Sequence, residues 1–429
     1  MEYHNINTDS LINPKNILNV NPYRSLNLFN FGLSGYINNF HIESQNYLRM
    51  DTIKDPYFKT EKIPQEYDLR FIPREIFLNW NYNYTYFFTV GKKIFNMSQG
   101  FVWQPINLFY DYPGYTIYAT ENKLIGPESY PSGFALGKID LQLKSFNGSL
   151  FFVPERFSIE ADHTLWYDTF QNNIDTSIIG VSIKTVQKGF SLKYLALTET
   201  ENKNTFKYGT QINYSISDFT FYVEGAYKNG IDRFIPVKNS EEKTYMLDSQ
   251  VKLIPADYKI ELNNTSDENY FSDILLGSKY RPGKNWSAEF ELYYNSFAWN
   301  SKEKDIYWEG IDYAVEGGKF EKELYEVDGE NLPASYLKQA ATYHKTKYLG
   351  EYNSNLSVTY NIKEKWDVEL RLINNLQDIS GNIITCLAYN GGKYWKGDLT
   401  LSLYYGEKKS QYGSSLYTGT VSSSIILEF

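Results

Sequence analysis

Alternation of apolar and polar residues constrains this chain more than any other feature. The alternation is clearest in residues 219–227, 286–294, 366–372 and 398–405. A period of two predicts β-strands, because a helix repeats at about 3.6 residues. Many of the polar positions carry charges, which a soluble two-layer core seldom tolerates on so many strands. The pattern therefore favours strands that separate lipid from a polar interior.

Short links join these segments in pairs, and longer polar stretches join one pair to the next. The expected turns lie at Asn38-Asn39, residues 81–83, Asn147-Gly148, Lys188-Gly189, Asp218, Ala256, Gly283-Lys284, Lys363-Glu364 and Lys396-Gly397. Tight turns at one end and long loops at the other are typical of outer-membrane barrels. We therefore predict an all-β fold, a single transmembrane antiparallel up-and-down β-barrel of about 18 strands, with 14 to 20 admissible. Its short turns would be periplasmic and its long loops extracellular.

The same pattern gives an expected division of the chain. Residues 1–26 would form an N-terminal periplasmic or pore-lining segment, and residues 27–429 the transmembrane barrel. Within the barrel, residues 95–130 are a candidate for a loop that folds inward. Residues 297–346, rich in Glu, Asp, Lys and Gly, would form a long extracellular loop that is solvated or narrows the pore.

Composition excludes several classes of protein. The net charge is -9 and the sequence has no run of Lys or Arg, which argues against nucleic acid as a partner. No stretch approaches the roughly 18 apolar residues of a membrane-spanning helix. The N-terminus has neither a basic region nor an apolar one, so it fits either a cytosolic protein or a mature chain whose signal peptide has been replaced by an initiator Met. The strand pattern favours the second interpretation. The 40 tyrosines fit two aromatic girdles, although aromatic residues also favour strands in general.

The last residues resemble a known signal. Phe429 ends the chain, and Val421, Ile425 and Leu427 lie on the same face of the expected last strand. A terminal Phe after apolar residues at alternate positions resembles the C-terminal signal of bacterial outer-membrane β-barrels. This resemblance implies that the barrel-assembly machinery recognises these four residues. It also implies that outer-membrane lipid and lipopolysaccharide surround the protein.

A second resemblance lies nearer the N-terminus. Residues 74–80, 90–93 and 99–107 are similar to a segment of putative porins of diderm bacteria, in which an acidic strand precedes a Gly-basic strand and a Pro-containing loop. The resemblance implies an outer-membrane porin. Period two places Glu75 and Lys93 toward the lumen, where they could pair across neighbouring strands. The alternative is that both are solvated surface charges.

Charged residues at the other inward positions predict the selectivity of the pore. The acids are Asp140, Glu224, Glu261, Glu289, Glu291, Asp367, Glu369 and Asp398, and the bases are Lys144, Lys193, Lys259 and Arg371. Rings of charge set pore selectivity through the field that they create. The excess of acids predicts a weak preference for cations.

Chemistry beyond transport has little support. Four histidines, His4, His41, His163 and His344, show no metal-binding spacing, and the acidic stretch 302–330 lacks the spacing of a Ca²⁺ loop. We expect no catalysis, metal or cofactor. The sequence predicts a porin for passive diffusion of small hydrophilic solutes, with a homotrimer as one candidate assembly. The alternatives are a surface adhesin or receptor on a barrel platform, a barrel enzyme that uses His163, and a soluble carbohydrate-binding β-protein.

Overall fold

Strands dominate the computed structural model of this chain. It describes residues 2–6, 10, 12, 23–24, 26–51, 68–93, 98–99, 101–105, 108, 134–154, 177–200, 206–229, 233–238, 243–247, 250–254, 258–263, 270–317, 326–327, 330–331, 336–337, 340, 344, 349–392, 395–415 and 417–427. Most regular elements in these ranges are β-strands; Ser301–Gly317 forms a helix, and residues 336–337, 340 and 344 are also helical. That helix is not long and apolar enough to cross a membrane, and the described residues contain no other candidate.

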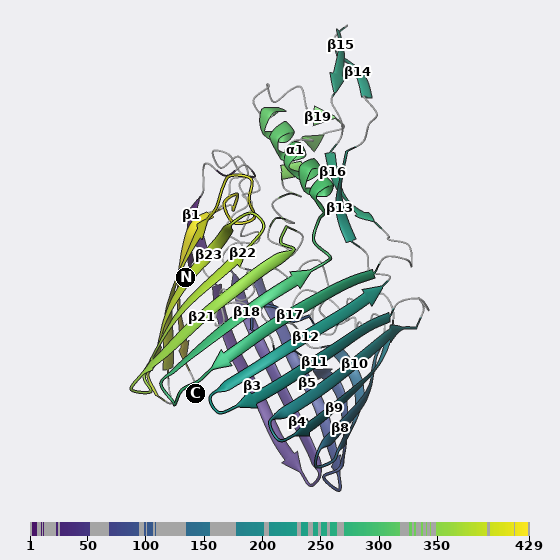
Figure 1. Ribbon diagram of the computed structural model, residues 1–429, viewed down its shortest axis with the longest axis vertical. Coiled ribbons are helices and arrows are strands. Elements are labelled where there is room, and N and C mark those ends of the chain that lie inside the picture. The colour runs from purple at the N-terminus through teal and green to yellow at the C-terminus, as the bar shows by residue number, and fades with distance from the viewer. Residues whose placement is uncertain are drawn as a thin grey trace.

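One antiparallel sheet of 19 strands makes up the body of the molecule (Figure 1). From β3 onward each strand pairs with the sheet strand that follows it in the chain, which is an up-and-down topology. The strands are β1 (Glu2–Ile6), β2 (Tyr23–Arg24), β3 (Leu26–Ile37), β4 (Phe40–Asp51), β5 (Asp68–Tyr82), β6 (Tyr86–Lys93), β7 (Phe134–Gln142), β8 (Phe146–Val153), β9 (Ile178–Gln187), β10 (Phe190–Glu199), β11 (Phe206–Ile216), β12 (Phe219–Asn229), β17 (Tyr270–Tyr280), β18 (Trp286–Asn295), β21 (Tyr352–Ile362), β22 (Trp366–Asn375), β23 (Ser380–Asn390), β24 (Trp395–Tyr405) and β25 (Tyr417–Leu427).

The first strand brings the two ends of this sheet together. Tyr3 of β1 lies opposite Val421 of β25 on one side and opposite Tyr23 of β2 on the other. Only Ser25 separates β2 from β3. If β2 and β3 are counted as one strand, the 19 strands give 18 positions around a barrel, as the sequence predicts. The predicted N-terminal segment therefore differs in its described parts, because β1 and β2 lie in the wall and cover strand edges that would otherwise stay open.

The two faces of the wall differ as the period of two predicts. On β12, Phe221 and Val223 are exposed on the outward face, whereas Tyr222 and Glu224 on the inward face are buried. The same alternation holds on β18, where Phe290 and Leu292 are exposed and Glu291 is buried. An apolar outer face and a polar inner face are the arrangement of a transmembrane barrel.

Aromatic side chains form two bands on the outward face. Near the short turns the ring centroids of Trp366 and Tyr389 lie 4.5 Å apart, and those of Phe219 and Tyr280 lie 4.3 Å apart. At the other end of the strands the centroids of Tyr227 and Tyr270 lie 5.4 Å apart. Amphipathic rings at both ends of an apolar band suit the two membrane interfaces.

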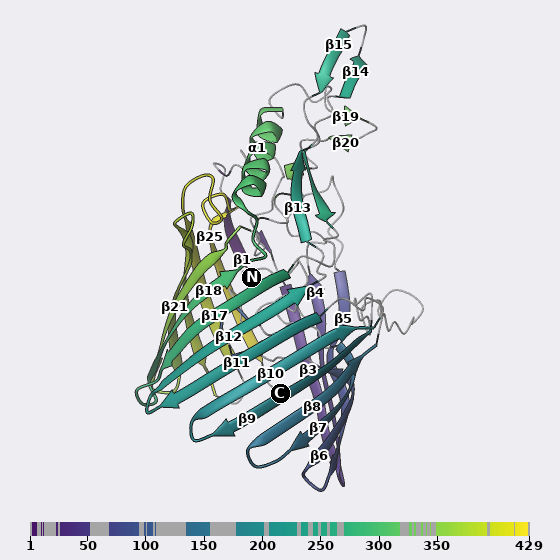
Figure 2. The ribbon, with the colours of Figure 1, turned by 45° about the vertical axis from the view of Figure 1, so that its right-hand side comes forward.

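The two ends of the barrel are connected differently. At one end, eight links of two to five residues join the described strands, and at the other end the links have between four and 56 residues (Figures 1 and 2). Lys188 and Gly189 have φ of 43° and 82°, which suits the two-residue turn of a hairpin. Two predicted turns are wrong by a few residues: Asn147-Gly148 lies on β8 and Lys396-Gly397 lies on β24.

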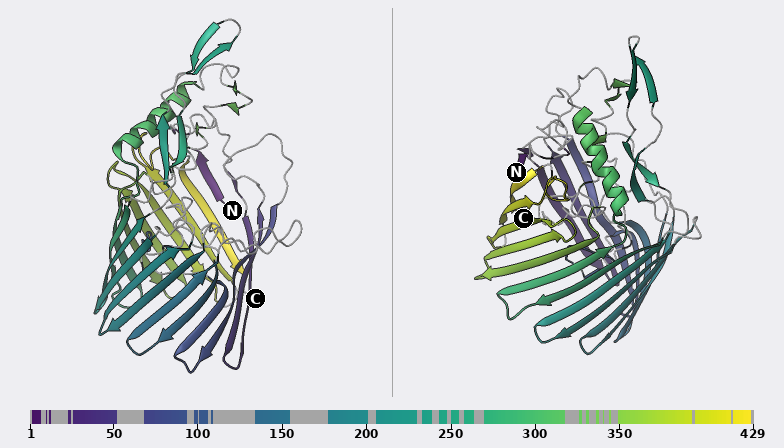
Figure 3. Two further views of the ribbon diagram at one scale, coloured as in Figure 1. Left: turned by 90° about the vertical axis from the view of Figure 1, so that its right-hand side faces the viewer. Right: turned by 45° about the horizontal axis from the view of Figure 1, so that its top comes forward.

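A separate structure rises from the end with long links (Figures 2 and 3). It contains two-stranded sheets and a helix: β13 (Arg233–Lys238), β14 (Lys243–Leu247), β15 (Gln250–Ile254), β16 (Tyr258–Asn263), α1 (Ser301–Gly317), β19 (Glu326–Val327) and β20 (Glu330–Asn331). We call it the outer unit. Its buried residues share one apolar cluster with the barrel rim: Ile12, Ile260, Phe271, Phe297, Trp299, Tyr307, Ile311, Ala314, Tyr336, Leu337, Ala340 and Leu349.

The helix of the outer unit begins at a well-formed cap. Asn300 Oδ1 accepts a hydrogen bond from Glu303 N at 3.0 Å, and Glu303 Oε2 accepts one from Asn300 N at 2.8 Å. Lys304 then donates to Gln377 at 2.7 Å, and Asp312 pairs with Lys409 at 2.6 Å. The segment predicted as a long extracellular loop is therefore in part a helix that contacts two neighbouring loops of the rim.

Candidate pore constriction

A short inward segment lies against the inner face of the barrel wall. Its described residues are 98–99, 101–105 and 108, which lie between β6 and β7 in the chain. We call these residues the inner segment. Two glutamates on the wall, Glu224 of β12 and Glu291 of β18, bind its main chain and are both 0% exposed.

Glu291 meets hydrogen-bond donors on every side. Its Oε1 accepts from Phe101 N at 2.5 Å and from the Tyr222 hydroxyl at 2.8 Å. Its Oε2 accepts from Val102 N at 3.0 Å and from Asn355 Nδ2 at 3.4 Å. A carboxylate can accept all four bonds because it carries only acceptors. Glu291 thus fixes two consecutive main-chain amides of the inner segment.

Glu224 binds the preceding residues of the segment in the same way. Its Oε1 accepts from Gln99 N at 2.5 Å and from Gln211 Nε2 at 2.9 Å, and its Oε2 accepts from the Ser98 hydroxyl. The two glutamates therefore hold residues 98 to 102 at two points. Burial of a charged group is tolerated where it is fully hydrogen-bonded, and charge-assisted bonds are the stronger kind.

Side chains of the inner segment add contacts to the wall. Trp103 stacks on Tyr293 with ring centroids 5.3 Å apart and an interplanar angle of 11°. The guanidinium of Arg371 lies 4.5 Å from the centre of the Phe101 ring. Leu108 is buried in a cluster with inward residues of β7 to β10 and β12. The inner segment therefore reaches across a large part of the inner wall.

Ion pairs along the wall use further charges. Lys279 lies 2.9 Å from Glu289, and Arg371 lies 2.6 Å from Glu369. Asp140 pairs with Lys138 at 2.8 Å. Pairs of this kind give the inner face short-range fields of both signs.

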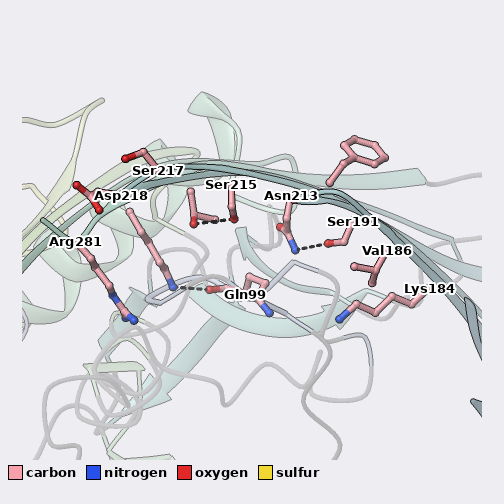
Figure 4. Close-up of a pocket in the computed structure, with 13 residues that line it drawn as sticks. Gln99, Lys184, Val186, Ser191, Asn213, Ser215, Ser217, Asp218 and Arg281 are labelled. Atoms are coloured by element: carbon pink, nitrogen blue, oxygen red, sulfur yellow. Dashed lines mark hydrogen bonds between the residues drawn. The ribbon is translucent and has the colours of Figure 1, made fainter. Parts of the chain in front are cut away.

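A cavity of about 600 Å³ opens beside the inner segment, toward the short turns (Figure 4). It is lined by Gln99, Lys184, Val186, Gly189, Phe190, Ser191, Asn213, Ser215, Ser217, Asp218, Thr220, Lys279 and Arg281. Lys279 Nζ donates to the Gln99 carbonyl at 3.2 Å, which joins the wall to the inner segment. Figure 4 shows Lys184, Gln99 and Arg281 on the same side of the strands. We call this space the cationic cavity.

Most of the charged residues predicted to line the pore lie on barrel strands. Glu224, Glu289, Glu291, Glu369 and Arg371 surround or neighbour the inner segment. Glu75 is half-buried on β5, and Lys93 of β6 lies 4.1 Å from the centre of the Phe77 ring. The others on the wall are Asp140 on β7, Lys193 on β10, Asp367 on β22 and Asp398 on β24.

Three residues predicted to line the pore lie elsewhere. Lys144 is in the turn between β7 and β8, because β7 ends at Gln142, and its side chain is exposed. Lys259 and Glu261 are on β16, which pairs with β13 in the outer unit. The segment 258–262 does form a strand, but that strand is not part of the barrel. Strand periodicity gives the conformation and cannot say which sheet a strand joins.

The predicted assembly residues are only partly described. Val421 and Ile425 are exposed on the outward face of β25, and Leu427 ends that strand. Phe429 lies outside the described residues. His163, the residue on which the enzyme alternative depends, also lies outside them. Among the described residues, no group of His, Cys, Asp or Glu could hold a metal ion.

The cations of the cationic cavity are not among the residues predicted from the sequence. Lys184 lies on β9, where Ile179, Val181 and Ile183 alternate outward. The same parity in the sequence would place Lys184 inward, so the signal was present. Lys279 at the end of β17 carries a similar signal, because Ile274 and Leu276 face outward before it.

Comparison with known proteins finds similar solved structures. Neither a protein-family model nor a curated protein matches the chain. Similar solved structures include Salmonella typhi OmpF in complex with daunomycin, which is 10% identical over 100% of this chain and 94% of the other, with a TM-score of 0.44. OccAB4 of Acinetobacter baumannii is 9% identical over 94% and 90%, with a TM-score of 0.41. A mutant Rh. blastica porin is 9% identical over 95% and 91%, with a TM-score of 0.38. The barrel itself is defined by its own strand register.

Proposed function

We propose that this protein is a porin of the bacterial outer membrane through which small hydrophilic solutes diffuse passively. The observation that carries the proposal is a polar inner wall that holds a short segment inside a barrel with 18 strand positions. A barrel of about this size leaves an aqueous interior unless loops fill it. The inner segment would then narrow the channel and set the size of the solutes that pass.

Solute permeation tests this proposal. Liposomes that contain the refolded protein should swell in neutral sugars, and the rate should fall steeply as the sugar becomes larger. The physical reason is that the inner segment limits the cross-section of the path. Swelling no faster than that of protein-free liposomes, for every sugar, would refute a passive channel.

We also propose a weak preference for cations, which fewer acidic residues support than the sequence predicts. Glu224 and Glu291 bind the inner segment, Glu261 belongs to the outer unit, and Lys279 and Lys184 add positive charge to the wall. Asp367 and Asp398 remain as inward acids on the strands, whereas Asp140 pairs with Lys138 at 2.8 Å. Reversal potentials in a KCl gradient measure the preference, and a potential of the sign expected for anions would contradict it.

The proposed surroundings follow from the outward face. An apolar band between aromatic bands suits outer-membrane lipid, and lipopolysaccharide would contact the end with the long links. The barrel-assembly machinery and a homotrimer are further proposed partners. Cross-linking of the protein in native membranes would give a trimer band if the barrels associate.

The outer unit favours a second candidate function. A helix packed in an apolar cluster that it shares with the barrel rim is more than a solvated loop needs, and it offers a fixed surface above the barrel. A surface adhesin or receptor would use such a platform. Deletion of residues 301–340 should then abolish attachment to the partner while conductance remains. Loss of conductance with unchanged attachment would exclude this candidate.

A further inference from the structure

The cationic cavity gathers positive charge at one place on the inner wall. Lys184, Lys279 and Arg281 come from β9, β17 and the turn after β17. They line one space with neutral donors such as Gln99 and Asn213 (Figure 4). A volume of about 600 Å³ lies within the range of small-molecule sites. The cavity therefore has both the room and the donors to hold a small solute.

The strand register adds a second observation. Lys184 lies directly opposite Lys193 on β10, and both side chains are on the inward face. Like charges directly opposite each other on neighbouring strands destabilise a sheet. The negative charge of Glu224 attracts Lys193. The same carboxylate also accepts hydrogen bonds from Gln99, Gln211 and Ser98. An anion beside this pair would relieve the repulsion.

The acidic residues at the cavity do not neutralise all of its positive charge. Glu289 binds Lys279 at 2.9 Å and accepts from the Tyr222 hydroxyl at 2.8 Å. Asp218, which also lines the cavity, lies in the turn between β11 and β12, where it is exposed. Lys184 and Arg281 bring further positive charge to the same lining. The field in the cavity therefore favours an anion.

We propose that the cationic cavity is a binding site for small oxyanions, with a phosphate or carboxylate group facing Lys184, Lys279 and Arg281. Phosphate should bind more tightly than a monocarboxylate, because it carries more charge and more acceptor oxygens. That a permeating anion occupies this site on its way through the barrel depends on the proposed channel. Anion binding itself does not depend on it. A local cationic site is compatible with a weak overall preference for cations, because the two depend on different charges.

Two measurements on the full refolded chain test the site. Broadening of the ³¹P signal of inorganic phosphate reports binding without any need for conductance, and acetate serves as a competitor. In parallel, phosphate is added to a planar bilayer at low ionic strength, where screening is weak. The variants are Lys184→Gln and Arg281→Gln, and the control is Lys284→Gln, which removes a charge from the same turn outside the cavity lining. A heat-induced gel shift shows that each variant is folded.

The expected result is binding of phosphate that each cavity variant weakens about tenfold, as loss of one charge-assisted bond implies, and that the control leaves unchanged. Acetate should compete more weakly than phosphate. If the folded wild-type protein does not bind phosphate, or if all variants bind equally, the site is refuted. If binding depends on Lys184 and Arg281 but no protein conducts, the site stands and the channel proposal fails.

Discussion

Two buried carboxylates hold the inner segment in place. Glu224 and Glu291 are surrounded by main-chain amides, a hydroxyl or phenol, and side-chain amides, all of which act as donors in the observed bonds. A side chain that carries a donor of its own cannot satisfy such a set. Both positions therefore require a carboxylate, and another kind of polar group would not satisfy the surrounding donors. Neither residue is free to act as a fixed charge in open water.

Replacement of Glu291 by Gln should loosen the inner segment. The amide would turn its NH₂ group toward Phe101 N or Val102 N, and a buried unsatisfied donor costs roughly 1–3 kcal/mol. We expect single-channel currents of Glu291→Gln to be larger and noisier than those of the wild type. Glu407→Gln, on an exposed loop residue, is the control. Identical current amplitude and noise in Glu291→Gln would show that the anchor does not limit the path.

A buried ion pair stabilises the wall near its long-link end. Lys228 Nζ lies 2.9 Å from Asp273 Oδ2, and the side chains are 3% and 4% exposed. Removal of one partner from a buried pair typically costs roughly 3–5 kcal/mol, because the other charge stays buried. Asp273→Asn should therefore lower the denaturant midpoint of the folded barrel clearly.

The matched control for that prediction is a surface pair. Lys409 and Asp312 lie 2.6 Å apart, but their side chains are 53% and 44% exposed. Exposed pairs contribute about 0–1 kcal/mol. Asp312→Asn should leave the midpoint nearly unchanged. Equal shifts for Asp273→Asn and Asp312→Asn would mean that burial of the pair has no energetic weight.

At the scale of elements, strands with one apolar face are those that the sequence predicts best. Residues 219–227, 286–294, 366–372 and 398–405 lie on β12, β18, β22 and β24. Because lipid lies on one side of each strand, every second residue has to be apolar. This alternation can be recognised directly in the sequence. Turns are less certain, because a polar pair such as Asn147-Gly148 can also lie on a strand.

The outer unit is the element that the sequence prediction misses. Charged residues in 297–346 suggest a solvated loop, yet Tyr307, Ile311 and Ala314 are spaced four and three residues apart and are all buried. This spacing places them on one face of a helix. This helical pattern is hard to recognise in the sequence because few apolar residues carry it. The residues that pack against it, such as Ile260 and Tyr336, come from distant parts of the chain.

The outer unit should be able to unfold while the barrel stays folded. Ile311 is 0% exposed, so Ile311→Asp would bury an unpaired charge and unfold the unit. We expect rapid proteolysis of residues 301–317 in this variant, with the heat-induced gel shift of the barrel retained. Asp305→Asn, on the exposed face of the same helix, should be as resistant as the wild type. Loss of the gel shift in Ile311→Asp would show that the unit and the barrel fold together.

For the whole molecule, closure of the sheet depends on a pairing that local sequence patterns do not show. β1 is only five residues long; it lies between β25 and β2, and its pairing with β25 joins positions more than 400 residues apart. The contact of the inner segment with Glu224 and Glu291 is of the same kind, because it joins positions more than 100 residues apart. The sequence predicts the inward charges of β12, β18 and β22, but it wrongly includes Lys144, Lys259 and Glu261. It does not predict which of the inward charges bind the chain itself and which face solvent.

We propose an open barrel that the inner segment narrows from within. The most direct test is the single-channel conductance of the refolded, detergent-purified full chain in a planar bilayer. Stable current steps of uniform size are the predicted result, because the inner segment is held at defined points on the wall. A barrel that is folded, as its heat-induced gel shift shows, and yet gives no current steps would contradict an open channel.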